Sequence, residues 1–249
     1  MQITMSSSRE TNGQTAATFG ANLLRETLNQ RGQANIIVAT GASQFEMLEA
    51  LLRETDIAWE KVTIFHLDEY VGLPVTHPAS FRKYLWERFH SKLPVPVLAF
   101  HYVAGDSDPA LECERLSRLI TQHPIDICFA GIGENAHLAF NDPPADFATE
   151  VPYLVVNLDE ACRRQQFGEG WFDSLGKVPG QAISMSIQQI LKSRHILITA
   201  PDTRKAQAVR DSIQGPVTNQ IPSSILQQHP NTHVFLDPES ASLLTQTSR

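Results

Sequence analysis

Cysteine is scarce in this chain of 249 residues, and long apolar runs are missing. The three cysteines, Cys113, Cys128 and Cys162, lie far apart and form no Cys-x-x-Cys pair. This spacing argues against a disulfide framework and against a zinc site, and it fits the reducing cytoplasm. Residues 1–12 are polar, without the apolar core of a signal peptide, and no run approaches the roughly 18 apolar residues that cross a membrane. Secretion and membrane insertion are therefore not expected.

Basic residues are outnumbered and do not cluster. The chain has 20 lysines and arginines against 27 acidic residues, which gives a formal net charge of -7 and a pI near 5.7. Because nucleic-acid surfaces need a basic patch, a nucleic-acid partner is not expected. A small anionic ligand would have to be bound by local donors instead of by the field of the whole protein. The apolar share of 42% can fill one core, and we expect a single domain over residues 1–249.

Helix-like and strand-like stretches alternate along the chain. The strand-like runs are 35–39, 62–67, 97–103, 125–130, 196–200 and 233–236. Apolar residues recur at helical spacing in the stretches 17–28, 45–52, 81–89, 111–120, 186–191, 201–213 and 222–228. This alternation predicts an α/β fold with a single doubly wound, mostly parallel sheet and helices on both faces. Ligands bind to such sheets near the carboxyl ends of the strands, where the strand order reverses.

The most informative stretch follows the run 125–130. Residues 131–144 read Gly-Ile-Gly-Glu-Asn-Ala-His-Leu-Ala-Phe-Asn-Asp-Pro-Pro, and they begin like the Gly-x-Gly-x-x-Ala form of a dinucleotide-binding loop. Such a loop requires a helix of several turns after it, which Asn-Asp-Pro-Pro at 141–144 would interrupt almost at once. We therefore interpret the glycines as points where the backbone approaches a ligand and turns His137 into a site.

His137 is the candidate acid–base residue of this stretch. Imidazole accepts and returns protons near neutral pH, provided that another group fixes its orientation and tautomer. Asn135 and Asp142 lie near enough in sequence to do so. The remaining histidines are interpreted as packed or surface residues, namely His66, His77, His90, His101, His123, His195, His229 and His233.

Asp68 and Glu69 form a second candidate group, directly after the run 62–67. Neighbouring side chains of an extended segment point to opposite sides, so only one of the two acids can face a ligand. The other acid would then support the site from behind. Taken alone, two neighbouring acids usually mark a solvated strand end.

A third group suits an anion such as phosphate. Between a strand-like run and a helix-like stretch lie Thr40, Gly41, Ala42 and Ser43. Free backbone N–H groups and the helix dipole attract an anion at such a position, and the two hydroxyl groups add donors. Lys205, at the start of a later helix, can add a positive charge, although a solvated lysine is the more common case.

A polar stretch at about 159–180 interrupts the alternation. It contains four glycines and the amphipathic pair Trp171-Phe172. Segments that close over a ligand need local freedom, and we expect a lid here. An ordinary long surface connection is the alternative.

Together the motifs resemble the glucosamine-6-phosphate deaminase/isomerase family, which includes galactosamine-6-phosphate isomerase-like members and, more distantly, 6-phosphogluconolactonases. The shared stretches are Asp-Glu-Tyr-Val-Gly-Leu-Pro at 68–74, His77-Pro78-x-Ser80 and the loop 131–143. The similarity extends over most of the chain, from about residue 35 to residue 244. It implies that a 2-amino-2-deoxyhexose 6-phosphate is converted to ketose 6-phosphate and ammonia, without a metal or an organic cofactor.

The resemblance also implies roles for individual residues. His137 would assist opening of the sugar ring, Asp142 would orient His137, and Asp68 would move a proton between C2 and C1, with Glu69 as the supporting acid. The residues implied for phosphate binding are Thr40, Gly41, Ala42, Ser43 and Lys205.

Three departures from the family pattern bear on this transfer. Asn135 stands where glucosamine-6-phosphate deaminases carry aspartate and where galactosamine-6-phosphate isomerase-like relatives carry asparagine, so the sugar epimer is open. Asp142 stands where the family has glutamate and is one methylene shorter, which puts its reach to His137 in question. The family's phosphate-clamping arginine has no clear counterpart in the polar stretch, where Arg163 or Arg164 could substitute.

Two other functions stay open on the sequence. A 6-phosphogluconolactonase carries a similar glycine–histidine loop but typically continues Thr-Ala-Ser-Leu-Phe-Pro, whereas this chain has Leu-Ala-Phe-Asn-Asp-Pro at 138–143. A non-catalytic sugar-phosphate sensor would not need Asp68 and His137 together. Family members differ in assembly, and a homo-oligomer is one of the states open to this chain.

Overall fold

The computed structural model describes residues 1–245 and contains seven α-helices and ten β-strands within them. The helices are α1 (Arg9–Arg31), α2 (Phe45–Arg53), α3 (Phe81–Arg88), α4 (Pro109–Thr121), α5 (Glu160–Gly168), α6 (Ile187–Leu191) and α7 (Ala206–Gln214). The strands are β1 (Gln2–Met5), β2 (Ala34–Val38), β3 (Val62–His66), β4 (Asp68–Tyr70), β5 (Ala99–His101), β6 (Ile127–Ala130), β7 (Tyr153–Asn157), β8 (Gln181–Met185), β9 (His195–Thr199) and β10 (Thr232–Leu236). Short 3-10 helices include η1 (Ala42–Gln44), η4 (Leu175–Lys177), η5 (Thr203–Lys205) and η6 (Pro222–Gln228).

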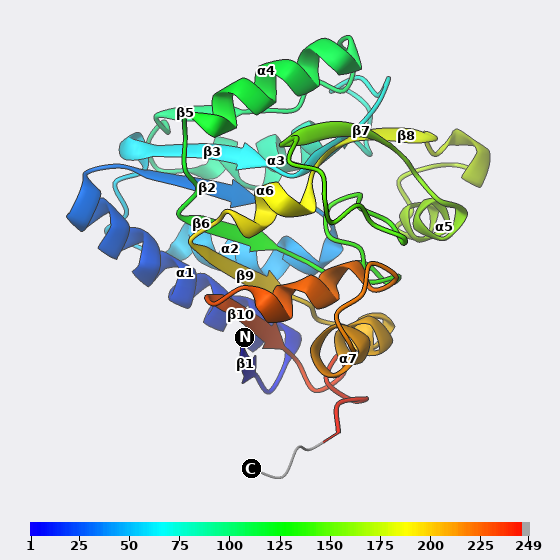
Figure 1. The fold of residues 1–249 in the computed structure, drawn as a ribbon. Helices are drawn as coiled ribbons and strands as arrows, with labels where there is room; N and C mark the ends of the chain where they lie inside the picture. Colours follow the sequence, from blue (N-terminus) through cyan, green and yellow to red (C-terminus); the bar gives the residue numbers. More distant parts are fainter. Residues whose placement is uncertain (246–249) are drawn as a thin grey trace.

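Seven strands form one parallel sheet in the order β1-β10-β9-β6-β2-β3-β5 (Figure 1). From β2 the chain continues outward through β3 and β5, whereas from β6 it continues the other way through β9 and β10. The strand order therefore reverses between β2 and β6. The predicted doubly wound, mostly parallel α/β fold is confirmed, and this reversal is the point where such folds bind ligands.

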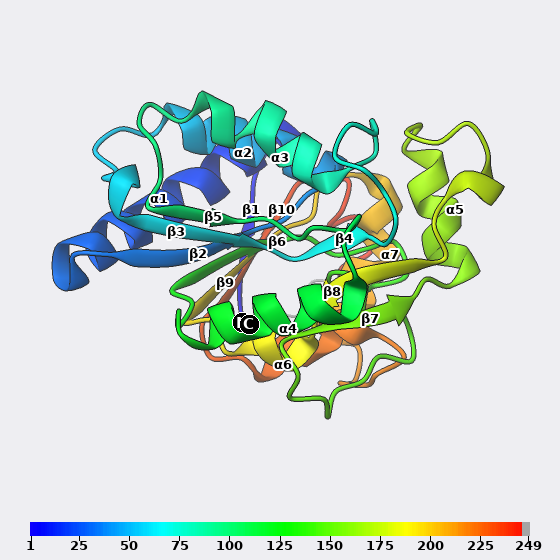
Figure 2. The ribbon, with the colours of Figure 1, turned by 90° about the horizontal axis from the view of Figure 1, so that it is seen from above.

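Side-chain alternation along the strands divides the core into two layers. In β2, Ile36 and Val38 pack with α1, α2 and α3, whereas Ile37 packs on the other side with α4, α6 and α7. Figure 2 shows α2 and α3 on one face of the sheet and α4 and α6 on the other. All three side chains are fully buried, and burying each one stabilises the fold by about 1.5–3 kcal/mol. Strands buried on both faces read as continuous apolar runs, which is why they were recognisable in the sequence.

A second, antiparallel sheet in the order β4-β8-β7 was not indicated by the sequence. Strand β4 follows β3 after a single residue, Leu67, and pairs Asp68 with Ser184 and Tyr70 with Ala182 of β8. The backbone of Leu67 also accepts a hydrogen bond from Met185 at 2.7 Å. Because β8 is only five residues long and lies over a hundred positions away, the pattern around Asp68 predicts an extended segment but not its partner.

Several predicted boundaries differ from the structure. Strand β1 and the first turns of α1 lie in the stretch that was interpreted only as polar, because β1 is an exposed edge strand that pairs with β10 alone. The extended run 97–103 forms a strand only at 99–101, and 222–228 is a 3-10 helix. The polar stretch 159–180 contains the ordered helix α5. None of the helices in residues 1–245 combines the length and apolar character that crossing a bilayer requires.

Candidate active site

A polar pocket opens at the reversal point between β2 and β6. Its walls come from the loops after these two strands, from Asp68 of β4, and from α5 and η5. The side chains or backbone of 40–43, Gly131, Gly133, Glu134, His137, Gln165, Gln166, Glu169, Asp202, Arg204, Lys205 and Arg9 line it. Segments that are far apart in the sequence, from Arg9 to Lys205, thus contribute to one pocket.

His137 lies at the pocket wall with its ring held from behind by Asp142. Its Nδ1 is 3.0 Å from Oδ1 of Asp142, so the shorter aspartate side chain reaches the ring. Asn135 donates from Nδ2 to the same carboxylate oxygen at 3.0 Å and accepts the backbone N–H of His137 at 3.2 Å. Asn135 was expected to orient the imidazole directly; instead, it acts on the backbone of His137 and on Asp142.

Asp142 connects this loop to residues 159–180, here called the covering segment, whose helix α5 lines one wall of the pocket. Its second carboxylate oxygen accepts the N–H of Asp159, the residue that caps α5, at 3.2 Å. Burial tends to raise the pKa of Asp142, but its hydrogen bonds with His137, Asn135 and Asp159 outweigh burial and lower that pKa. A carboxylate that stays charged favours a proton on Nδ1 of His137, which leaves Nε2 free to exchange protons in the pocket.

Replacing Asp142 with asparagine is expected to lower kcat by about 10²–10⁴-fold, because an amide can stabilise the wrong imidazole tautomer. Asp142→Glu keeps the charge and is the matched control, which should retain most of the turnover. The pKa of Asp142 is lowered from 3.8, so its contribution to stability is present above that pH and is lost as the pH falls further. In urea unfolding, Asp142→Asn should therefore have a lower free energy of unfolding than the unmodified protein near neutral pH. The difference should become smaller below pH 3.8. The same difference at neutral and at acidic pH would contradict this prediction.

Gly133 is required beneath the imidazole ring. A Cβ atom at this position would overlap three ring atoms of His137. The backbone N–H of Gly133 donates to the carbonyl of His137 at 3.0 Å, so the loop cannot simply move away. Glycine thus permits a close approach that any other residue would prevent.

Gly133→Ala is expected to displace His137 and to lower kcat/KM by about a hundredfold, because a misplacement of about 1 Å can have that effect. The matched control is Gly176→Ala in η4, where a Cβ meets no atom within 4 Å and the backbone has no left-handed φ. Steady-state kinetics of both variants tests the steric argument. Equal activities in the two variants would show that the ring position tolerates the added methyl group.

Asp68 and Glu69 point in opposite directions from β4, as their adjacency predicted. Asp68 lines the pocket, and burial together with the neighbouring charge of Glu69 raises the pKa of its carboxyl group well above 3.8. Glu69 points away and is fully buried. One acid therefore faces the pocket and the other lies behind it, which is the arrangement that the sequence predicted.

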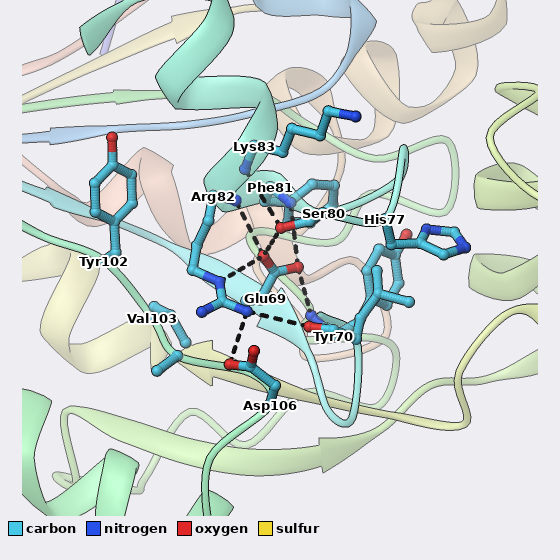
Figure 3. A network of polar contacts seen from close by, with 12 residues as sticks. Glu69, Tyr70, His77, Ser80, Phe81, Arg82, Lys83, Tyr102, Val103 and Asp106 are labelled. Atoms are coloured by element: carbon cyan, nitrogen blue, oxygen red, sulfur yellow. Dashed lines mark hydrogen bonds and ion pairs between the residues drawn. The ribbon is translucent and has the colours of Figure 1, made fainter. Parts of the chain in front are cut away.

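The carboxylate of Glu69 is surrounded by hydrogen-bond donors, most of them at the start of α3 (Figure 3). It accepts hydrogen bonds from Ser80 Oγ at 2.7 Å and from the N–H groups of Tyr70, Phe81 and Arg82 at 3.0–3.2 Å. The guanidinium of Arg82 is 3.6 Å away and pairs with Asp106 at 2.8 Å. Burial raises the pKa of Glu69, while the hydrogen bonds act in the opposite direction. Glu69 thereby joins β4 to α3 and fixes the backbone that carries Asp68.

The opposite end of the pocket suits an anion. Gly41 has a left-handed φ of 95°, which glycine adopts without strain, and η1 begins directly after it. Lys205 is 7% exposed, and burial lowers the pKa of its ammonium group despite Glu134 and Glu169 nearby. Within residues 1–245, Lys205 has no carboxylate within ion-pair distance. A buried cation beside an N–H-rich turn is a site where an anionic group is stabilised.

The two arginines proposed from the sequence lie outside the pocket. Arg163 donates to the carbonyls of Leu175 and Val178 at 3.0 Å and so holds the end of the covering segment. Arg164 is exposed and pairs with Glu160 one helical turn away. Among residues 1–245, the arginines that line the pocket are Arg9 and Arg204, which sequence reasoning missed. Arg204 is adjacent in the sequence to Lys205, a predicted phosphate-binding residue, and this adjacency could have identified Arg204 as a pocket residue.

His137, Asp142 and Cys162 form one group whose ligand atoms lie within 4.8 Å of one another and could hold a metal ion. Burial, and then the charge and hydrogen bond of Asp142, raise the pKa of the Cys162 thiol. The protonated thiol is therefore favoured, and the same contacts serve to hold Asp142.

Comparison with known proteins finds relatives in both sequence and fold. Curated glucosamine-6-phosphate deaminases from Oenococcus oeni and Streptococcus uberis are each 36% identical, over 91% and 98% of this chain and 93% and 100% of their own lengths. A solved structure of a monomeric glucosamine-6-phosphate deaminase superposes with a TM-score of 0.89 at 30% identity, covering 98% of this chain and all of the other. The 6-phosphogluconolactonase from Thermotoga maritima shares the fold, with a TM-score of 0.78 at 15% identity over 95% of this chain and 99% of its own. Residues 7–235 match the family of glucosamine-6-phosphate isomerases and 6-phosphogluconolactonases, and the chain belongs to this family.

Proposed function

We propose that this protein is an amino-sugar-6-phosphate deaminase that converts glucosamine 6-phosphate to ketose 6-phosphate and ammonia. The observation that carries the proposal is one pocket with a raised-pKa carboxyl group, Asp68, an oriented imidazole, His137, and an anion-binding end at 40–43 and Lys205. Deaminase relatives that match nearly the whole chain support the same reaction. The reaction consumes one water molecule for each ammonia released.

Three groups carry the proposed mechanism. Nε2 of His137 exchanges a proton with the ring oxygen and C1 hydroxyl, which opens the sugar to its aldehyde form. Asp68 removes the proton from C2 and returns it to C1, while O1 gains a proton and the amino nitrogen loses one, so that C1 becomes an alcohol and C2 an imine. Water adds to this imine, and ammonia leaves. The phosphate binds at 40–43 and Lys205 and fixes C1 and C2 relative to Asp68 and His137.

The alternatives differ in what they require of Asp68. A 6-phosphogluconolactonase hydrolyses an ester and needs no proton transfer between neighbouring carbons. A sensor needs the anion-binding end but no carboxyl group with a raised pKa facing the ligand. The side-chain carboxyl group of Asp68 is buried, at 7% residue exposure, and receives no hydrogen bond from residues 1–245. Such burial destabilises the fold and aids neither lactone hydrolysis nor phosphate binding, so it disfavours both alternatives.

Ammonia release from glucosamine 6-phosphate by the purified protein tests the proposal, with galactosamine 6-phosphate and a 6-phosphogluconolactone assayed alongside. We expect release from the gluco epimer and no release after His137→Ala, although that variant should still bind the sugar phosphate. Release from galactosamine 6-phosphate alone would move the substrate to the other epimer. Lactone hydrolysis without ammonia release would establish the lactonase, and sugar-phosphate binding without turnover would favour the sensor.

We further propose a single cytoplasmic domain over residues 1–249, with 159–180 as its lid; residues 246–249 lie outside the described part. Three buried, unpaired thiols in residues 1–245 support the cytoplasmic location. Phe172 of the covering segment packs on Tyr70 at 5.5 Å between ring centroids, and this contact supports the proposed lid. A homo-oligomer stays a prediction.

A further inference from the structure

We propose that Arg204 supplies the second phosphate-binding cation of this pocket, in place of an arginine from the covering segment. The inference rests on the proposed function, because it assigns a residue to the phosphate end of the same site. Lys205 and the backbone of 40–43 offer one full positive charge to a group that carries nearly two. A second cation is therefore needed, and Arg163 and Arg164 are engaged elsewhere.

Arg204 is already oriented toward this end of the pocket. Its Nε and Nη2 donate to Oδ2 of Asp202 at 3.2 and 3.0 Å. Its Nη1 has only a looser partner, Oε1 of Glu134 at 3.5 Å. One edge of the guanidinium is thus fixed, while the other edge is available to an anion. Guanidinium groups fixed in this way bind phosphate with strong, directional hydrogen bonds.

Arg9 ties this arrangement to the phosphate loop. From the first turn of α1, it donates to the carbonyl of Ala42 at 2.6 Å and to Glu46 at 2.8 Å. Its Nη1 is also 3.9 Å from Oδ2 of Asp202, the oxygen that holds Arg204. Asp202 therefore lies between two arginines and links the loop 40–43 to Arg204. Arg9 is a positioning residue in this arrangement, because its Nε and Nη2 already donate to Glu46 and to the carbonyl of Ala42.

Asp202 has a strained backbone conformation, which hydrogen bonds to Asp237 maintain. Its φ is 89°, a left-handed value that is costly for a residue other than glycine, and its N–H donates to both oxygens of Asp237. Burial tends to raise the pKa of Asp202, but the hydrogen bonds from Arg204 outweigh it and lower that pKa. The aspartate thus stays charged and keeps Arg204 at the pocket.

Glu134 occupies the position that an incoming phosphate would take on Arg204. Its carboxylate is 36% exposed and forms no closer ion pair within residues 1–245 than the one at 3.5 Å. Glu169 of the α5 C-cap adds a second negative charge near Lys205 and Arg204. A dianion must displace Glu134 and overcome both charges. Removing the charge of Glu134 should therefore strengthen phosphate binding, whereas removing the charge of Arg204 should weaken it.

The test compares Arg204→Gln with Arg164→Gln, because both side chains are exposed and one lies in the pocket while the other lies on the covering helix. Inorganic phosphate is the probe, and its dissociation constant is measured by ³¹P NMR titration, which needs no turnover. We expect Arg204→Gln to weaken phosphate binding by about tenfold to a hundredfold, the effect of losing a charge-assisted contact. Arg164→Gln should bind as the unmodified protein does, and Glu134→Gln should bind more tightly.

Steady-state kinetics with glucosamine 6-phosphate adds a second readout, in which Arg204→Gln should raise KM far more than it lowers kcat. Wild-type phosphate affinity in Arg204→Gln, or a loss of affinity in Arg164→Gln, would overturn the inference. So would a protein that binds no phosphate at all. If phosphate binding follows the expected pattern but no variant releases ammonia, Arg204 keeps its role and the deaminase proposal fails instead.

Discussion

Asp68→Asn is expected to abolish deamination and, at the same time, to make the protein more stable. Asparagine has nearly the same shape as aspartate but cannot accept a proton from C2. General base catalysis contributes about 10²–10⁴-fold to a rate, and turnover should fall by at least that factor. Binding of the sugar phosphate should persist, because the anion-binding end of the pocket is unchanged.

The gain in stability follows from the raised pKa of Asp68. Burial first, and the charge of Glu69 second, raise that pKa well above 3.8, so the folded protein holds the proton more tightly than the unfolded chain does. Stability is therefore lost progressively as the pH rises above 3.8 and Asp68 is forced to ionise in the folded state. The amide of the Asp68→Asn variant would carry no such charge. The stability advantage of the variant should grow with pH over this range and then level off.

Three measurements check this prediction. Urea unfolding across pH gives the stability difference, and the pH dependence of kcat/KM in the unmodified enzyme should show an acidic limb at a pH well above 3.8. Asp173→Asn, an exposed aspartate of the covering segment, is the control and should change neither quantity appreciably. An active Asp68→Asn enzyme would remove Asp68 as the base. An inactive variant that is less stable at every pH would point to a structural role.

The positions of Asp68 and His137 were predictable because both follow strands of a parallel sheet. Carboxyl ends of such strands meet at one edge, so two motifs about seventy positions apart fall on one face without any knowledge of their contacts. Arg9 offered no comparable signal. It is a single basic residue in a polar terminus, and its contact with Ala42 depends on how α1 crosses the sheet.

The sequence contains local signals for helix α5, but the glycines of the surrounding stretch outweighed them in the prediction. Asp159 caps the helix by accepting the N–H of Cys162, and no glycine or proline occurs until Gly168. Four glycines over the whole stretch nevertheless favoured a loop. The small antiparallel sheet is different, because pairing between β4 and β8 depends on tertiary contacts that residue patterns do not encode.

Glu69→Gln is expected to destabilise the protein by about 3–5 kcal/mol, the usual effect of removing one partner of a buried charge network. The carboxylate of Glu69 is an acceptor at both oxygens and faces four donors and the guanidinium of Arg82. A glutamine places an NH₂ group where one oxygen stood, so donors face donors. The resulting unsatisfied N–H groups are buried, and each costs about 1–3 kcal/mol.

Activity should fall along with stability, because β4 and the start of α3 share Glu69 as their junction. Ser80→Ala is the graded control: it removes one donor to Glu69 and the cap on Lys83, and it should destabilise by about 1 kcal/mol. Unfolding in urea at neutral pH and kcat of the folded fraction separate the two effects. If folded Glu69→Gln keeps full kcat, Asp68 is positioned by β8 alone. If Glu69→Gln is as stable as Ser80→Ala, the negative charge of Glu69 contributes little to the free energy of unfolding. Hydrogen bonds with neutral donors would then be what stabilises the contact between β4 and α3.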